Sequence, residues 1–156
     1  MLRVVFTVAL LAAVVAVTLP AVDRAGVQRS DTAVRSTIDS LVETARMLAA
    51  GSDAVSAGEP ARRVVTLDLP TDGFASAGLR RFVISRAAVD GNRTDRRATR
   101  FSWRVAGGAR QVRLVDGLSL RPAGGRLAVE TGGRHRLRLE LVRAGGQRVV
   151  RLRTFK

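Results

Sequence analysis

The sequence predicts an α+β chain: an N-terminal transmembrane helix that continues into an amphipathic helix, then an all-β antiparallel sheet or sandwich of about eight strands. Three observations support this prediction. A long uncharged run stands near the N-terminus, apolar residues then recur with a helical period, and beyond Pro60 they alternate with polar ones. The expected parts are an anchor at 1–22, a stalk helix at 23–50, a linker at 51–61 and a basic β domain at 62–156.

Residues 4–22 form the expected anchor, nineteen residues without a charge. As a helix this run would be roughly 28 Å long, close to the hydrocarbon thickness of a bilayer. A cleaved signal peptide is the main alternative, but its best site would put Leu19 at −3, where a small residue is expected. A buried soluble helix would need more surrounding protein. The sequence therefore favours an uncleaved, single-pass anchor in the cell membrane, with the head exported from the cytoplasm.

The stalk carries an apolar stripe whose successive members are 7, 4, 3, 4 and 3 residues apart, which is heptad spacing. Asp31 interrupts the stripe near its start, and Gly51 is a natural stop for the helix. Either the stripe packs on the head's own sheet, or anchor and stalk form one helix that associates through it with other copies or partner proteins. Pro20 would kink or restart such a helix. The stripe consists of Val27, Val34, Ile38, Leu41, Ala45 and Leu48.

The head is expected to bury one face of each strand. Gly-Gly pairs at 107–108, 124–125, 132–133 and 145–146 separate the runs and suit tight hairpin turns, which need positive φ. The residues expected to point inward are Val65, Leu67, Leu69, Phe82, Ile84, Phe101, Trp103, Val105, Val112, Leu114, Leu118, Leu120, Leu127, Val129, Leu137, Leu139, Leu141, Val150 and Leu152.

The net charge of +14 is concentrated in the head, where residues 60–156 hold 22 basic and seven acidic side chains. Codon bias in a GC-rich genome would explain abundant arginine, but it does not remove acidic residues. The last hairpin is the most basic stretch, and its outward face is either an ordinary solvated surface or a surface for an acidic ligand or partner. Few aromatics are available for base stacking, which disfavours nucleic acid. The candidate anion-binding residues are Arg136, Arg138, Arg151 and Arg153.

Residues for catalysis and metal binding are scarce. The chain has no Cys or Tyr, and His135, its one histidine, stands between two arginines. No carboxylate pair has a spacing that indicates a joint role, and nothing positive supports a calcium site at 91–95. The sequence therefore predicts a non-enzymatic protein without a cofactor or metal.

Two stretches, VVTLDLPTDGFASAGLRRFVIS and GGRHRLRLELVRAGGQRVV, together with the helix–stalk–head plan, resemble type IV pilins and pseudopilins. The chain also resembles a small uncharacterised archaeal family of membrane-anchored proteins linked to pilus or secretion machinery. The apolar run lacks the acidic fifth position of a prepilin-peptidase substrate. The resemblance therefore implies an accessory or minor pilin-like component of the cell envelope. The alternative function is an extracytoplasmic binding module that captures an acidic ligand on the arginine-rich β surface.

Overall fold

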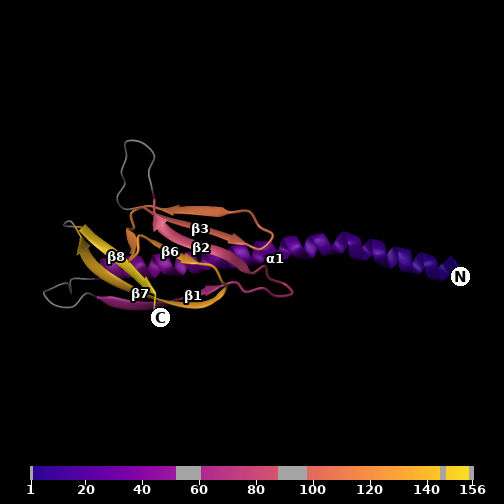
Figure 1. Cartoon of the computed structure of the whole chain (residues 1–156), viewed down its shortest axis with the longest axis horizontal. Coiled ribbons are helices and arrows are strands. Elements are labelled where there is room, and N and C mark those ends of the chain that lie inside the picture. The colour runs from indigo at the N-terminus through magenta and orange to yellow at the C-terminus, as the bar shows by residue number, and fades with distance from the viewer. Residues whose placement is uncertain (1, 52–60, 88–97, 145–146, 155–156) are drawn as a thin grey trace.

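The computed structural model describes residues 2–51, 61–87, 98–144 and 147–154, without the side chains of residues 2, 3, 15, 17–20 and 147. One helix and eight strands make up this described part (Figure 1). Their bounds are α1 (Leu2–Ala50), β1 (Arg62–Leu69), β2 (Leu79–Arg86), β3 (Thr99–Val105), β4 (Gln111–Val115), β5 (Leu120–Pro122), β6 (Arg126–Val129), β7 (Gly133–Ala144) and β8 (Gln147–Thr154). The expected linker at 51–61 lies almost wholly outside the described residues.

The strands form two four-stranded sheets, in the orders β1-β7-β8-β5 and β4-β3-β2-β6. Neighbouring strands are antiparallel except for β5, which runs parallel to β8. Alternate residues of each sheet point into one shared core, because side chains of a strand alternate between its two faces. The expected α+β chain with a head of about eight strands is confirmed.

The glycine pairs have more varied roles than expected. Gly107, Gly125 and Gly133 have positive φ, as the turn chemistry required. Only the pair at 107–108 joins antiparallel neighbours within the described residues, whereas the pairs at 124–125 and 132–133 connect strands of different sheets. The expectation of a hairpin at those two pairs is wrong, because the chain crosses there from one sheet to the other. The pair at 145–146 lies outside the described residues.

Helix α1 is continuous from Leu2 to Ala50 and passes through Pro20. Its second half packs along the head, and its first half extends beyond it (Figure 1). Two hydrogen bonds tie the packed half to both sheets: Thr37 Oγ1 donates to the carbonyl of Asp68 in β1 at 2.8 Å, and Trp103 of β3 donates to Asp31. The helix thus belongs to the same folded unit as the strands. Among the described residues, which leave out the side chains at 15 and 17–20, no helical stretch is long and apolar enough to cross a membrane.

The apolar stripe of α1 lies inside the head. Val34, Ile38, Leu41 and Ala45 are 0% exposed and belong to the same core as the strand residues. Val27 and Leu48 are partly buried against that core. The packing of the stripe on the head's own sheet is therefore confirmed. In this fold the β sandwich covers four of the six side chains fully and Val27 and Leu48 in part, which leaves little of the stripe accessible for self-association.

Strand β4 has the opposite phase from the one expected. Val112 and Leu114 are exposed, and Val115 is buried. Gln111, Arg113 and Val115 stand opposite Trp103, Phe101 and Thr99 of β3, whose side chains face the core. On this inner side Arg113 Nη2 donates to Asp39 Oδ1 of α1. A polar contact with the helix thus replaces the apolar contact that alternation had predicted at this edge strand.

Asp31, which interrupts the stripe, has a polar partner in the head. Its Oδ1 accepts a 2.6 Å hydrogen bond from Nε1 of Trp103, a side chain that is otherwise buried. Its Oδ2 accepts from Nε of Arg35 at 3.0 Å, and the Arg35 guanidinium lies 5.6 Å from the centroid of the Trp103 ring. A buried indole N–H without an acceptor costs free energy. The hydrogen bond to Asp31 offsets this cost and so permits the burial of Trp103 in the core.

Replacing Ile38 or Leu41 by Asp should unfold the head, because truncation of such a side chain to Ala already costs about 2–5 kcal/mol and a buried charge costs more. The measurement is the free energy of unfolding by denaturant. Met47→Asp on the same helix is the control, since Met47 is 48% exposed, and it should cost about 1 kcal/mol or less. Equal stability of Ile38→Asp and Met47→Asp would contradict the burial of the stripe.

Replacing Asp31 by Ala should destabilise the fold by about 1.5–3 kcal/mol, because the Trp103 indole then loses a charged acceptor. Asp39→Ala removes a more exposed ion pair with Arg113 and should cost about 0–1 kcal/mol. A double-mutant cycle with Trp103→Phe isolates the Asp31–Trp103 coupling. A coupling energy near zero would show that the hydrogen bond does not stabilise the fold.

Candidate anion-binding site

The four arginines expected to bind anions lie on the outer face of the sheet β1-β7-β8-β5. In the β7–β8 ladder Arg138 is opposite Arg153, and Arg151 is opposite Glu140. Arg136 lies further along β7, opposite Thr66 of β1. The structure therefore brings Arg138, Arg151 and Arg153 together and places Arg136 to one side.

Glu140 is the acidic residue at the centre of this face. It is only 7% exposed, and its two carboxylate oxygens lie 3.8 Å from Nε of Arg62 and 3.7 Å from Nε of Arg153. A carboxylate buried to this degree requires nearby cations to offset the loss of hydration. Glu140 thus holds β1 and β8 to β7 electrostatically, and one negative charge is shared between two arginines.

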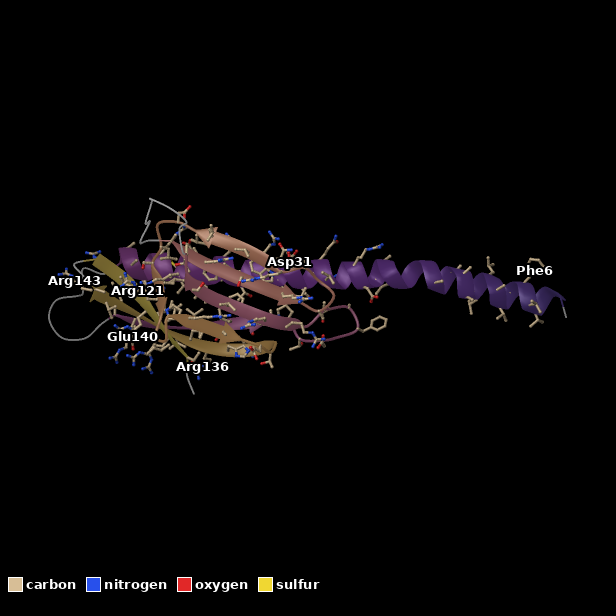
Figure 2. All side chains as sticks on the ribbon, turned by 45° about the horizontal axis from the view of Figure 1, so that its top comes forward. Phe6, Asp31, Arg121, Arg136, Glu140 and Arg143 are labelled. Carbon is tan, nitrogen blue, oxygen red and sulfur yellow. The ribbon has the colours of Figure 1, made fainter. Side chains whose placement is uncertain are left out.

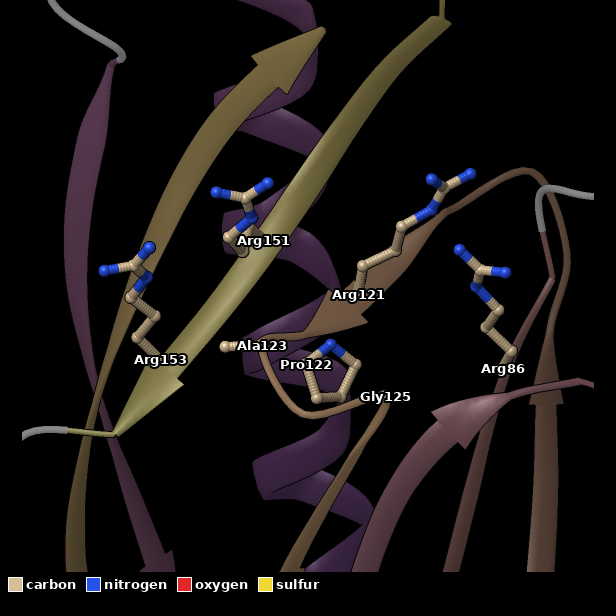
Figure 3. A pocket seen from close by; sticks show the side chains of 7 residues that line it. All are labelled: Arg86, Arg121, Pro122, Ala123, Gly125, Arg151 and Arg153. Atoms are coloured by element: carbon tan, nitrogen blue, oxygen red, sulfur yellow. The ribbon is translucent and has the colours of Figure 1, made fainter. Parts of the chain in front are cut away.

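A pocket of ≈ 440 Å³ opens beside this face, where the edge of one sheet meets the end of β2 in the other (Figure 3). Arginines come from three strands: Arg86 from β2, Arg121 from β5, and Arg151 and Arg153 from β8. The parallel pairing of β5 with β8 sets Arg121 directly beside Arg151. The other lining residues are Pro122, Ala123 and Gly125. None of these residues is acidic.

Arg121 is the least satisfied cation of the pocket. Its Nε is buried and has no hydrogen-bond partner among the described residues. The pKa of Arg121 is lowered from its ordinary value, first by desolvation on burial and then by the positive charge of Arg86. Figure 3 shows both side chains on the same side of the pocket. A negatively charged group placed here would relieve both effects.

The pocket contains two of the four predicted arginines, Arg151 and Arg153, and two that were not predicted, Arg86 and Arg121. Local alternation could not have found the latter. Arg86 stands at the end of its strand, and Arg121 belongs to a strand of only three residues. Their proximity depends on the parallel β5–β8 pairing and on how the two sheets meet, and neither leaves a signal within a short stretch of sequence.

A second basic pocket of ≈ 240 Å³ lies on the outer side of the other sheet, and two of its arginines already have polar partners. Nη2 of Arg110 donates to Oγ of Ser102 at 3.5 Å, and Nε of Arg104 donates to the carbonyl of Gly108 at 3.3 Å.

The ring Nε2 of His135 lies 3.0 Å from the carbonyl of Thr131. No group of three or more His, Cys, Asp or Glu side chains in the described part of the chain could hold a metal ion.

Comparisons with known proteins identify a family but no function. No curated protein and no solved structure matches the chain. The family model that matches residues 1–155 is described as a domain of unknown function (DUF7311). This match includes α1 and all eight strands, so the chain belongs to the DUF7311 family.

Proposed function

We propose that this chain is a non-enzymatic, membrane-anchored protein of the cell envelope, whose residues 4–22 sit in lipid and hold the basic head outside the cytoplasm. One observation carries the proposal: large apolar side chains of α1 are exposed where the helix extends beyond the head (Figure 2). They are between 53% and 71% exposed, with Phe6 at the upper limit. These residues are Val4, Val5, Phe6, Val8, Leu10, Leu11 and Val14.

The free energy of transfer favours an apolar environment for this part of α1. Burying one such side chain contributes about 1.5–3 kcal/mol, and the exposed residues share one uncharged run. Water is therefore a poor solvent for it, and contiguous apolar surfaces of this kind are typical of membrane or protein contacts. Lipid is the environment that suits apolar side chains on all sides of a helix.

The end of the uncharged run coincides with the nearest part of the head. Val22 is its last residue, and Asp23 and Arg24 follow directly. Val22 and Phe74 line the same pocket, and Phe74, in the loop between β1 and β2, is 100% exposed. An exposed aromatic ring at this level suits the boundary between headgroups and hydrocarbon. The depth at which the run would insert thus agrees with the position of the head.

The arrangement also supports a pilin-like role. The resemblance to type IV pilins rests on the helix–stalk–head plan, and α1 fits this plan, because its second half packs on the head and its first half projects from it. Because the stripe of the second half is covered by the head, lateral contacts in an assembly would have to come from the first half or from the strands. An accessory or minor component of a pilus or secretion assembly is the form of the proposal that fits.

Replacing Val8 and Leu11 together by Asp should release the full chain from membranes, because two charges in an apolar segment of this length oppose insertion by about 2.5–3.5 kcal/mol each. The measurement is the fraction that resists alkaline carbonate extraction and floats with vesicles. Mass measurement of the purified protein should show that residues 4–22 remain attached.

The matched control places the same two charges on exposed apolar positions of the head, Val112→Asp with Leu114→Asp, and should leave the membrane fraction unchanged. Extraction of the unaltered chain by carbonate, or equal membrane fractions for the two double variants, would overturn the proposed anchor.

A further inference from the structure

The arginine pocket between β2, β5 and β8 has more positive charge than the described residues neutralise. Four guanidinium groups line it. Among the described residues one of the four, Arg153, has an ion pair, with Glu140 at 3.7 Å. That carboxylate is shared with Arg62. Arg86, Arg121 and Arg151 have no ion pair among the described residues. The pocket therefore attracts anions more strongly than a solvated surface with balanced charges.

Arg121 gives this attraction a specific position. Its backbone is held in a strand between Leu120 and Pro122, which are both buried, so Arg121 starts from a fixed position beside the pocket. Its buried Nε has no acceptor in the described protein. Because Nε is withdrawn from solvent, a ligand in the pocket would meet the terminal Nη groups of Arg121, where a charged acceptor would form a strong hydrogen bond.

We propose that this pocket binds a ligand that carries a phosphomonoester or diphosphate group. A carboxylate offers two oxygens and a single charge, which would leave most of the N–H donors of the pocket unmatched. A phosphate group offers at least three acceptor oxygens and nearly two charges, and guanidinium forks fit it in bidentate geometry. The volume of ≈ 440 Å³ lies within the roughly 300–1,000 Å³ of small-molecule sites. Pro122 and Ala123 provide an apolar wall for the rest of the ligand.

Two sources could supply such a group: a soluble phosphate ester and a lipid headgroup. Arg121 lies toward the end of the head that is remote from Phe6, the labelled residue of the projecting helix (Figure 2). If that helix is in the bilayer, the pocket faces away from the same membrane, which favours a soluble ligand. The shared phosphate chemistry does not depend on the anchor, so the pocket can be tested whether or not the chain is in a membrane.

The test is calorimetric titration of the full chain in neutral detergent micelles with pyrophosphate. Arg121→Gln and Arg86→Gln should each weaken binding about tenfold, because each removes a charged donor. Arg63→Gln is the control: it removes the same charge from β1, at the opposite edge of the sheet, and should change affinity less than about twofold. Binding should weaken as salt is raised.

Two further titrations identify the source and the limits of the site. Short-chain phosphatidic acid in the micelles presents a phosphomonoester on a lipid, and phosphatidylglycerol presents only a diester. Binding of pyrophosphate alone supports a soluble ligand, and added preference for phosphatidic acid over phosphatidylglycerol supports a headgroup. Equal weakening by Arg121→Gln and Arg63→Gln, no binding of either phosphomonoester or diphosphate probe, or tighter binding of an oligoglutamate peptide than of pyrophosphate would overturn the proposal.

Discussion

The fold depends on the insertion of an apolar helix face between two sheets. Val34, Ile38 and Leu41 are fully buried among strand residues, so the inner faces of the strands would be open to water without α1. Polar contacts on either side of the stripe set the position of the helix: Thr37 bonds to β1, Asp31 to β3. The hydrophobic contact supplies most of the free energy, and the hydrogen bonds specify one register of the helix against the strands.

This packing constrains what the projecting half of α1 can do. Because α1 is one helix, the orientation of its first half is set by the burial of its second half. The change from exposed to buried side chains occurs within a short stretch, between Val22 and Val27. A membrane in contact with residues 4–22 would therefore meet a head in a defined orientation, with Phe74 near the bilayer and Arg121 remote from it. The anchor and the arginine pocket would then operate in different environments.

The sequence predicted what depends on short-range periodicity. Alternation identified the buried residues of most strands, and the heptad spacing identified the buried face of α1. Prediction from the sequence failed where a contact between residues far apart in the chain determines which side chains are buried or paired. In the sequence, Asp31 interrupts the apolar stripe. In the structure it accepts a hydrogen bond from Trp103, 72 residues away, which short-range periodicity could not predict. Val112 and Leu114 were assigned to the wrong face because Arg113 pairs with Asp39 of the helix. Arg86 and Arg121 meet only through the crossing of the two sheets.

Genome composition and structure explain different properties of the arginines. Codon bias in a GC-rich genome would explain the choice of arginine over lysine across the chain, and it would predict solvated side chains spread over exposed positions. Arg80 and Arg134, each paired with an aspartate at the surface, fit that description. Arg121 does not, because its Nε is withdrawn from water beside a second cation and has no acceptor among the described residues. No partner among the described residues offsets the cost of that arrangement, and the proposed binding of an anion would offset it.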